Sequence, residues 1–404
     1  MAPRPATRDW LTADVWRIAL SAFCADLGYQ AVLAVFPLFL VLRLHAPVWA
    51  YGMTTAAAYG VGALSGYVGG RVGDRTGRKR VAVWGNAFIA LMALPGLAAG
   101  AFQAAALLVV GWWARNFRSP PRRAMLIEVV APADRGRAFG FLHALDVGGG
   151  TLAALYAFIM VAVHISLRTV LLVTLVPLLA STAVLATTRA GRQRAPQAGN
   201  APDSAPALPP DQRRTDLAVY RGVLLAAALY GFSAYSAGFP ILTVAQGTHD
   251  PALGVLGYVL FLGVSALTGL WIGAQRWEAI RALPLLGYLA AALGSAALGV
   301  SALLHLGLGG LYPAMAVLGF ALGIVETLEP TLVARVTPAR TASGGMGSLT
   351  AARSAGLFVG NLALGLLYLI GPAYAYGYAA VLALGATTTL LITARRTLPG
   401  TRPA

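Results

Sequence analysis

Long apolar runs alternate with short polar segments along the whole chain. The runs are about 20 residues long, which is the length a helix needs to cross the hydrocarbon core of a bilayer. Lipid offers no partners for backbone polar groups, so helices are the economical interpretation, and a transmembrane barrel would show short alternating segments instead. The pattern predicts helices near residues 16–42, 48–70, 81–102, 104–127, 138–161, 167–188, 218–244, 252–274, 282–304, 309–333, 343–370 and 373–394.

A polar stretch rich in proline, alanine, arginine and glutamine divides these twelve helices into two sets of six. It cannot build a core, so we predict a flexible cytoplasmic linker. The predicted fold is therefore an all-α integral membrane protein with twelve transmembrane helices. Its parts are an N-terminal six-helix bundle over residues 1–188, the linker over 189–216 and a C-terminal six-helix bundle over 217–404.

The two halves resemble each other where the fourth and tenth predicted helices end. Ala-Pro-Ala-Asp-Arg at 131–135 matches Thr-Pro-Ala-Arg-Thr at 337–341, and residues 139–146 run parallel to 346–353. Parallel repeats about an axis normal to the membrane occur in transporters, whose substrate site lies between the repeats near the midplane. We therefore expect two pseudo-symmetric bundles.

Composition agrees with a membrane protein. Of the 404 residues, 58% are hydrophobic and 11% are charged, whereas a soluble domain carries about a quarter charged residues. The net charge of +16 would suggest nucleic-acid binding in a soluble chain. Here the arginines fall mostly in alternate loops, so no nucleic-acid partner is expected. The single cysteine, Cys24, cannot form an internal disulfide and is expected to behave as a small apolar residue.

The arginine asymmetry predicts the orientation in the membrane. The loops on the side of both termini hold Arg4, Arg8, the cluster at 71–80, Arg135, Arg137, the linker, Arg276, Arg281, Arg340, Arg395 and Arg396. The opposite loops hold only Arg43 and Arg168. Cytoplasmic loops carry the positive excess, so both termini are predicted to be cytoplasmic in a bacterial inner membrane. The first apolar run is too long for a signal peptide and is expected to be retained as a helix.

An ordered motif separates the second and third predicted helices, over residues 70–80. Gly70 would let a neighbouring helix approach closely, and Gly77 permits a tight turn. Asp74 can accept hydrogen bonds and lie at the positive N-terminus of another helix. Arg75 and Arg78 can pair with carboxylates at nearby cytoplasmic helix ends. The candidates for these carboxylates are Glu128 and Asp134.

This motif resembles the signature loop of the major facilitator superfamily, which reads glycine, three residues, Asp-Arg, any residue, Gly-Arg-Lys. A plain cluster of cytoplasmic charge would explain the arginines but not the ordered glycines and aspartate. The resemblance implies a transporter that works by alternating access, with residues 70–80 as a cytoplasmic latch of the outward-facing state. The equivalent segment of the second half, 269–281, keeps Gly273 and Arg276 but lacks the Asp-Arg pair.

Three further segments are similar to a poorly characterised bacterial branch of this superfamily, which is related to drug/proton antiporters. They are residues 21–40, 115–124 and 135–146. The chain departs from the branch at Arg123, where aspartate is usual. It also departs after the glycines at 148–150, where the branch and the antiporter signature have Gly-Pro.

Charges inside predicted transmembrane helices are functional candidates because a charge in the bilayer is costly. Asp26 lies mid-helix among apolar neighbours, which favour the neutral carboxyl and make it a candidate proton carrier. Arg115 and Arg118 are three residues apart and share a face of the fourth helix. An acid on the first helix and an arginine on the fourth are similar to drug/proton antiporters. We predict that Asp26 couples protons and Arg115 tunes it; the alternative is a buried ion pair that only fixes helix packing.

Other polar and aromatic residues are predicted to line the substrate cavity. Asp146 and Arg353 hold matching repeat positions, and either bind polar substrate groups or pair locally. His143 shares a face with Asp146, but two ligands are too few for a metal site, so no metal is predicted. The predicted cavity set is Tyr29, Arg118, His143, Asp146, Tyr230, Tyr235 and Arg353. Glu326 and Glu329 are predicted to form a cytoplasmic gate or to contact substrate.

These patterns predict a secondary transporter, no enzyme and no cofactor. The chain has one lysine and lacks a Gly-Lys-Ser/Thr phosphate loop, a Gly-x-Ser-x-Gly elbow and a His-Glu-x-x-His motif. Proton-coupled export of a small molecule by a monomer is the first prediction, with the bilayer, the substrate and protons as partners. The alternatives are proton-coupled uptake of an organic anion, favoured by the arginines, and metal-ion export, favoured by the acids. A non-transporting receptor and a membrane transferase using His143 and Asp146 complete the set.

Overall fold

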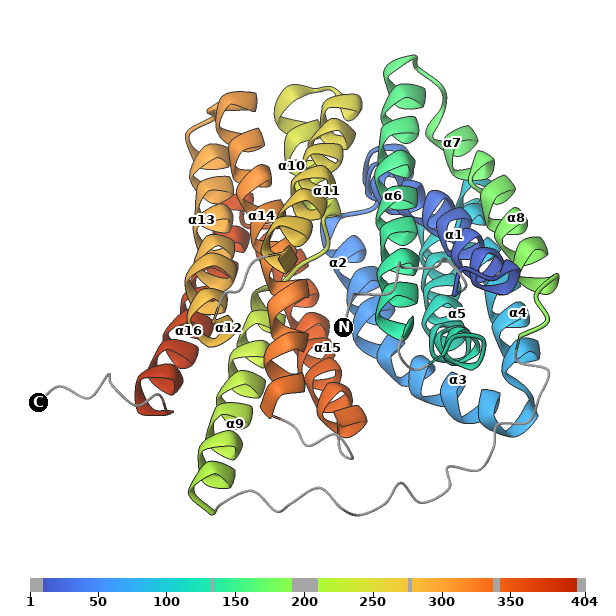
Figure 1. Cartoon of the computed structure of the whole chain (residues 1–404). Helices are drawn as coiled ribbons and strands as arrows, with labels where there is room; N and C mark the ends of the chain where they lie inside the picture. The colour runs from blue at the N-terminus through green and yellow to red at the C-terminus, as the bar shows by residue number, and fades with distance from the viewer. Residues whose placement is uncertain (1–9, 132–133, 191–209, 275–277, 337–341, 398–404) are drawn as a thin grey trace, which may run out of the picture. The chain divides into compact units, whose positions relative to one another are not determined.

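A computed structural model describes residues 10–131, 134–190, 210–274, 278–336 and 342–397 (Figure 1). Within these residues all regular structure is helical. Most of the predicted linker, both chain ends and the repeat segment 337–341 lie outside the described residues.

Ten helical segments of the described chain are long and apolar enough to cross a bilayer. They cover residues 13–43, 78–97, 137–162, 167–186, 217–248, 251–274, 279–303, 307–333, 348–367 and 372–395. Each coincides with a predicted transmembrane helix. The chain is therefore a multi-pass membrane protein.

Two further predicted helices are helical but more polar. Residues 48–70 fall on α2 (Val48–Ala56), the π-helical η2 (Ala57–Val61) and α3 (Gly62–Thr76). Residues 104–127 fall on α5 (Ala101–Glu128). Glycines and polar residues lower the hydropathy of residues 48–70, and arginines lower that of residues 104–127. Membrane crossing by these two segments, and so the count of twelve, stays a prediction.

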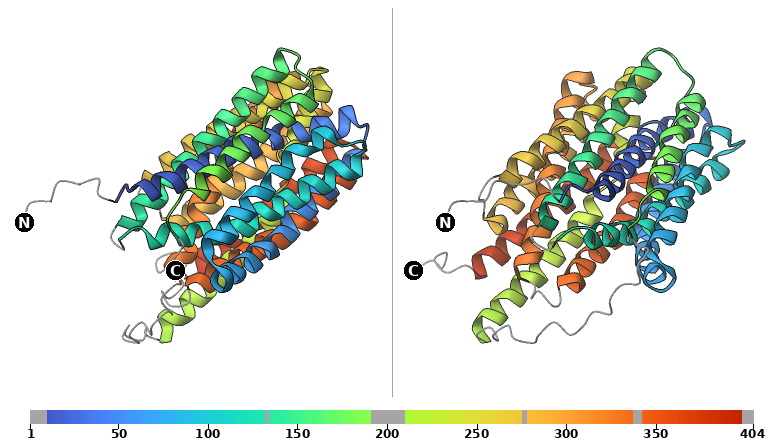
Figure 2. Two further views of the ribbon diagram at one scale, coloured as in Figure 1. Left: turned by 90° about the vertical axis from the view of Figure 1, so that its right-hand side faces the viewer. Right: turned by 45° about the vertical axis from the view of Figure 1, so that its right-hand side comes forward.

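The first compact unit comprises Met1–Phe36 and Gly62–Ala201. Besides α3 and α5 it holds most of α1 (Ala13–Leu38), α4 (Arg78–Ile89), the 3₁₀ helix η3 (Ala90–Leu97), α6 (Arg135–Ala162), α7 (Leu167–Val173) and α8 (Leu175–Ala186). Figure 2 shows α4 and α5 side by side, and both α3 and α4 pack against α5. A core cluster joins Val15, Ile18 and Ala22 of α1 to Met125 of α5 and Leu185 of α8. The α1 residues recur every three or four positions, as expected for a buried helix face.

The second compact unit comprises Pro37–Val61 and Pro202–Ala404. It holds η1 (Phe39–Arg43), α2, η2, α9 (Pro210–Ser233), α10 (Gly238–Thr248), α11 (Pro251–Ala274), α12 (Ala279–Ala282), η5 (Leu283–Tyr288), α13 (Leu289–Leu303), α14 (Gly307–Val336), α15 (Ala342–Leu367) and α16 (Pro372–Thr397). In it α13 packs against both α14 and α16, and α9 packs against α15 and α16.

Residues 37–61 belong to the N-terminal half in sequence but cluster with the second unit. Small residues explain the contact, because α2 packs closely on α15. A Cβ atom on Gly52 would lie 2.7 Å from the carbonyl oxygen of Asn361. Close backbone approach at glycine is a common way for membrane helices to pack.

The predicted helix 218–244 is broken. Its regular structure ends at Ser233 and resumes at Gly238 as α10. The backbone N–H of Ser236 instead donates to the side-chain Oδ1 of Asn361, at 2.9 Å. The Ser236 hydroxyl also lies 2.6 Å from the Tyr51 hydroxyl. A side-chain amide from α15 therefore satisfies a backbone group that the break leaves without a helical partner.

Candidate functional site

A buried acid and a buried tyrosine lie one turn apart on α1. Asp26 is 6% exposed, and the Tyr29 hydroxyl donates a hydrogen bond to its carboxylate. The same hydroxyl accepts a hydrogen bond of 3.1 Å from Nη2 of Arg115, on α5. Among the residues that the structure describes, Arg115 makes no direct ion pair with Asp26. The Tyr29 hydroxyl therefore links the acid to Arg115, the residue predicted to tune it.

Aromatic rings hold the Arg115 guanidinium in place. Its carbon lies 4.8 Å from the centre of the Tyr29 ring and 4.7 Å from that of the Trp112 ring. The two rings meet edge to face at 5.9 Å. A cation held over aromatic faces is stabilised by their quadrupoles, most strongly where water is excluded. Trp112 precedes Arg115 by three residues, a spacing that places both on one face of α5.

The next two arginines of α5 have different surroundings. Nη2 of Arg122 lies 3.6 Å from Oδ2 of Asp146, on α6. Arg118 is only 1% exposed, and its Nε and Nη1 have no hydrogen-bond partner among the described residues. Sequence reasoning missed Arg122, although the spacing of Arg115, Arg118 and Arg122 along one helix face was a readable signal.

His143 does not join this cluster. The structure places its side chain in an exposed position, whereas Asp146 pairs with Arg122. No group of three or more His, Cys, Asp or Glu side chains suited to a metal occurs in the described part of the chain. Of the two roles predicted for Asp146, binding of substrate groups or a local ion pair, the structure shows the ion pair, with Arg122.

A second ion cluster, with one fully buried acid, lies in the second unit. Arg353 of α15 donates to Oε1 of Glu326 at 2.6 Å and lies 3.4 Å from Oε2 of Glu329, both on α14. Glu329 is 0% exposed, and its Oε1 accepts a 2.6 Å hydrogen bond from the Tyr288 hydroxyl. The Arg353 guanidinium lies 5.8 Å from the Tyr230 ring centre. Arg353 therefore also pairs locally, and it is the counter-charge of both candidate gate acids.

A cavity of about 160 Å³ opens beside this cluster, within the second unit. Its polar lining includes Tyr230, Tyr235, Ser295 and Arg353, and most of the remaining lining is apolar. The Tyr235 hydroxyl lies 3.1 Å from the Ser295 hydroxyl. The break between α9 and α10 also lines the cavity, through Ala234 and Ala237 among others. Apolar walls with a few placed polar groups are typical of small-molecule sites.

The motif at residues 70–80 is mostly helical rather than a loop. Helix α3 continues to Thr76 and α4 begins at Arg78, so Gly77 alone separates them. Its φ of +110° is a conformation that other residues rarely adopt, which explains the glycine. Arg78 donates to Asp74 at 2.9 Å and to Glu128 of α5 at 2.6 Å. Arg75 is exposed and has no ion pair with a described residue.

Close packing at this motif falls on Gly69 and Gly73 rather than on the predicted Gly70, and a Cβ atom on Gly73 would lie 2.9 Å from Cγ of Pro121. A Cβ atom on Gly69 would overlap the carbonyl oxygen of Phe117 in α5. A Cβ atom on Gly70 would meet only Pro120, at an ordinary contact distance of 3.5 Å. Gly69 therefore allows the closest backbone approach of α3 to α5 at this motif.

The sequence profile described as Major Facilitator Superfamily matches residues 18–361. The chain belongs to this superfamily. No curated protein sequence matches it.

Solved structures of other major facilitators share the fold at low sequence identity. The peptide transporter POT has a TM-score of 0.74 and 16% identity, over 95% of this chain and 94% of its own. A bacterial homologue of the human lysosomal transporter Spinster, inward-facing and unoccupied, has a TM-score of 0.72 and 15% identity. The match covers 99% of this chain and 100% of the homologue. The nucleoside transporter NupG has a TM-score of 0.76 and 11% identity, over 94% of this chain and 99% of its own. At these identities the likeness shows the fold.

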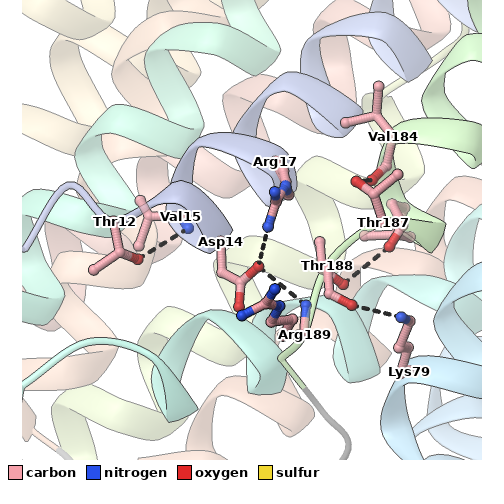
Figure 3. A network of polar contacts seen from close by, with 10 residues as sticks. Thr12, Asp14, Val15, Arg17, Lys79, Val184, Thr187, Thr188 and Arg189 are labelled. Carbon is pink, nitrogen blue, oxygen red and sulfur yellow. Dashed lines mark hydrogen bonds and ion pairs between the residues drawn. The ribbon is translucent and has the colours of Figure 1, made fainter.

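A polar network fastens three helix ends of this major facilitator near the α3–α4 turn (Figure 3). Lys79 of α4 donates to the carbonyl oxygen of Thr188, just beyond α8. Asp14 in the first turn of α1 accepts from Arg17 at 3.1 Å and from the backbone N–H of Arg189 at 3.0 Å. The acid at a helix start and the ammonium at a helix end each suit the local helix dipole. The side chains of Asp14 and Lys79 thus bind the stretch that leads into the predicted linker.

Proposed function

We propose that this major facilitator carries a small molecule by alternating access and couples transport to protons through Asp26. The proposal includes twelve membrane crossings in two pseudo-symmetric bundles, residues 1–188 and 217–404, joined by the linker 189–216. It places a monomer in a bacterial inner membrane with both termini cytoplasmic. The Arg78 contacts to Asp74 and Glu128 are the proposed latch, and Glu326 and Glu329 the proposed gate.

The observation that carries the proposal is the buried chain of contacts from Asp26 through Tyr29 to Arg115. An ionised Asp26 accepts a charge-assisted hydrogen bond from the Tyr29 hydroxyl. A protonated Asp26 is a poorer acceptor, so the phenol is freed to bind elsewhere. Because Tyr29 also accepts from Arg115, a proton on α1 changes the contacts of α5. A single proton can in this way bias the packing of two helices.

The cavity in the second unit is a proposed binding site for the substrate. Its tyrosine, serine and arginine side chains can fix polar substrate groups, and its apolar lining can hold hydrocarbon. Discontinuous helices commonly form the sites of secondary transporters, and the α9–α10 break lines this cavity. The similar solved structures include a peptide transporter and a nucleoside transporter, which supports a small organic substrate.

Proton coupling through Asp26 is compatible with two directions of transport. Export by proton antiport is the direction that the resemblance of α1 and α5 to drug/proton antiporters favours. Uptake of an organic anion together with a proton is the second candidate. A specific observation favours it, namely that the buried guanidinium of Arg118 has no described carboxylate partner.

Exchanging Asp26 for asparagine is expected to reduce substrate-driven proton flux to the level of vesicles without the protein. Asparagine has nearly the size of aspartate, and its amide oxygen can accept the Tyr29 hydrogen bond. Its side chain cannot take up a proton at the pH of the assay. The measurement uses everted vesicles with an acidic lumen and a quenched pH dye, to which lipophilic cations, organic anions or divalent metals are added. Right-side-out vesicles with an acidic exterior and labelled anions test uptake.

The matched control is Asp250→Asn. Asp250 is exposed and caps α11, where its Oδ1 accepts from the Ala252 N–H at 2.8 Å, and asparagine caps helices equally well. This variant should transport like the wild type. Proton flux in Asp26→Asn equal to that of the control, in both vesicle orientations, would remove Asp26 from the mechanism.

A further inference from the structure

Along α5, the buried charges of the described residues do not balance. Arg115, Arg118 and Arg122 of α5 contribute three positive charges, whereas Asp26 and Asp146 are the two carboxylates that meet them. Arg115 is bound to Tyr29, and Arg122 is paired with Asp146. Among the described residues this leaves Arg118 with no acceptor for Nε or Nη1.

An isolated guanidinium in this position is unfavourable. Arg118 is 1% exposed, and arginine does not lose its proton in proteins. Burial of an uncompensated charge forfeits hydration without any return from a partner. The close contact between α4 and Arg118 involves the uncharged base of the side chain, because a Cβ atom on Gly85 would lie 2.8 Å from Cβ of Arg118. A methionine or leucine would fill the same space without that penalty.

Arg122 offers further unused donors beside Arg118. The two residues are four apart, so their side chains share one face of α5. Nε and Nη1 of Arg122 are also buried without an acceptor, because only Nη2 approaches Asp146. Two guanidinium groups with free N–H donors on one face match the two oxygens of a carboxylate, or those of a phosphonate or phosphate.

We propose that Arg118 and Arg122 form an anion site for the carboxylate, phosphonate or phosphate group of the transported substrate. The inference rests on the proposed transport function and adds the charge of the substrate. Anion binding would provide Arg118 with the counter-charge that no described residue supplies. It would also satisfy the free donors of Arg122 while Asp146 keeps its own pairing.

This site also fixes the sign of the coupling. The charged and titratable groups around Asp26 are Tyr29, Arg115, Asp146, Arg118 and Arg122. Protonation of Asp26 removes a negative charge that competes with the anion for the arginines. By linkage, a proton and the anion then strengthen each other's binding. Because the proton and the anion favour each other's binding, this coupling supports transport of both in the same direction. That is the second candidate function, uptake of an organic anion together with a proton.

The test measures thermal unfolding of the purified protein in zwitterionic nanodiscs. The probes are benzoate and benzylphosphonate, with neutral benzamide and cationic benzylamine at matched ionic strength. The anions should raise the unfolding temperature of the wild type by about 2 °C or more, and more at acidic pH. Benzamide and benzylamine should leave it unchanged.

Three variants separate a binding role from a structural one. Arg118→Met should abolish the response to anions and raise the unfolding temperature of the ligand-free protein, because an uncompensated charge has gone. Arg118→Lys keeps the charge without the planar fork and should show a weakened response. Arg168→Gln, on an exposed residue away from the cluster, should match the wild type.

Several results would overturn the proposal. They are an Arg118→Met protein that still responds to anions, a ligand-free Arg118→Met protein that is less stable than the wild type, and a wild type that responds to neither anion. A response to phosphatidylglycerol nanodiscs but not to the soluble anions would assign the arginines to a lipid headgroup. The test uses no proton gradient, so it can fail while Asp26-dependent flux persists, and the reverse.

Discussion

Replacing Arg353 by methionine should lower the free energy of unfolding by about 3–5 kcal/mol, because it leaves a carboxylate buried without its cation. The carboxylate concerned is Glu329, which is 0% exposed and lies 3.4 Å from Nη1 of Arg353. Tyr288 would still donate to Glu329, but a hydrogen bond from a neutral hydroxyl does not supply the positive charge that is lost. The measurement is denaturant or thermal unfolding in detergent or nanodiscs.

Matched variants identify the buried acid as the cause. Arg353→Met combined with Glu329→Leu should recover most of the lost stability, since both charges then leave the core together. Glu326→Gln alone should cost under about 1 kcal/mol, because the Glu326 side chain is 54% exposed and its ion pair is hydrated. A single Arg353→Met variant as stable as the wild type would show that Glu329 has another counter-charge.

Gly69→Ala should destabilise the protein by about 3 kcal/mol, at the upper end of typical overpacking effects. The added methyl group would overlap the backbone carbonyl oxygen of Phe117. A backbone atom cannot rotate away as a side chain can, so α3 and α5 would have to separate. Thermal unfolding and the yield of folded protein in membranes measure the effect.

The neighbouring glycine supplies the control. Gly70→Ala places its methyl group 3.5 Å from Cβ of Pro120, at normal contact distance. It should be neutral, or stabilising by up to about 1 kcal/mol through the higher helix propensity of alanine. Equal losses for both variants would mean that the segment responds to side-chain volume in general, and not to contact with Phe117.

Local patterns predicted the helices and the turn well. Ten apolar runs became helical segments able to cross a bilayer, because length and hydrophobicity are properties of each run alone. Gly77 was assigned to a turn, and its positive φ confirms that assignment. The pairing of Arg78 with Glu128 was also expected, since two helix ends of opposite charge follow from the motif and the topology.

The sequence was less informative wherever a distant contact decides the outcome. Pro240 has no N–H for the Ser236 carbonyl, and with Gly231 and Gly238 it marked residues 218–244 as deformable. The sequence could not show that Asn361, more than a hundred residues away, accepts from the Ser236 backbone N–H at the break. The spacing of Asp26 and Tyr29 showed that they share a helix face. It could not show that the tyrosine stands between Asp26 and Arg115, because that depends on how α1 and α5 are rotated against each other.

Lys79 is the only lysine in the chain, and its ammonium group holds the carbonyl just beyond α8. Amine-reactive dyes, cross-linkers and affinity resins therefore meet a single side-chain target, and that target is a joint between helices. Acylation would remove its charge and leave one neutral amide N–H in place of the ammonium that binds the Thr188 carbonyl. A lysine-specific protease would likewise cut this chain at one place, the start of α4. Lys79 therefore has a structural role in this protein, and labels should be attached to introduced cysteines or to the chain ends.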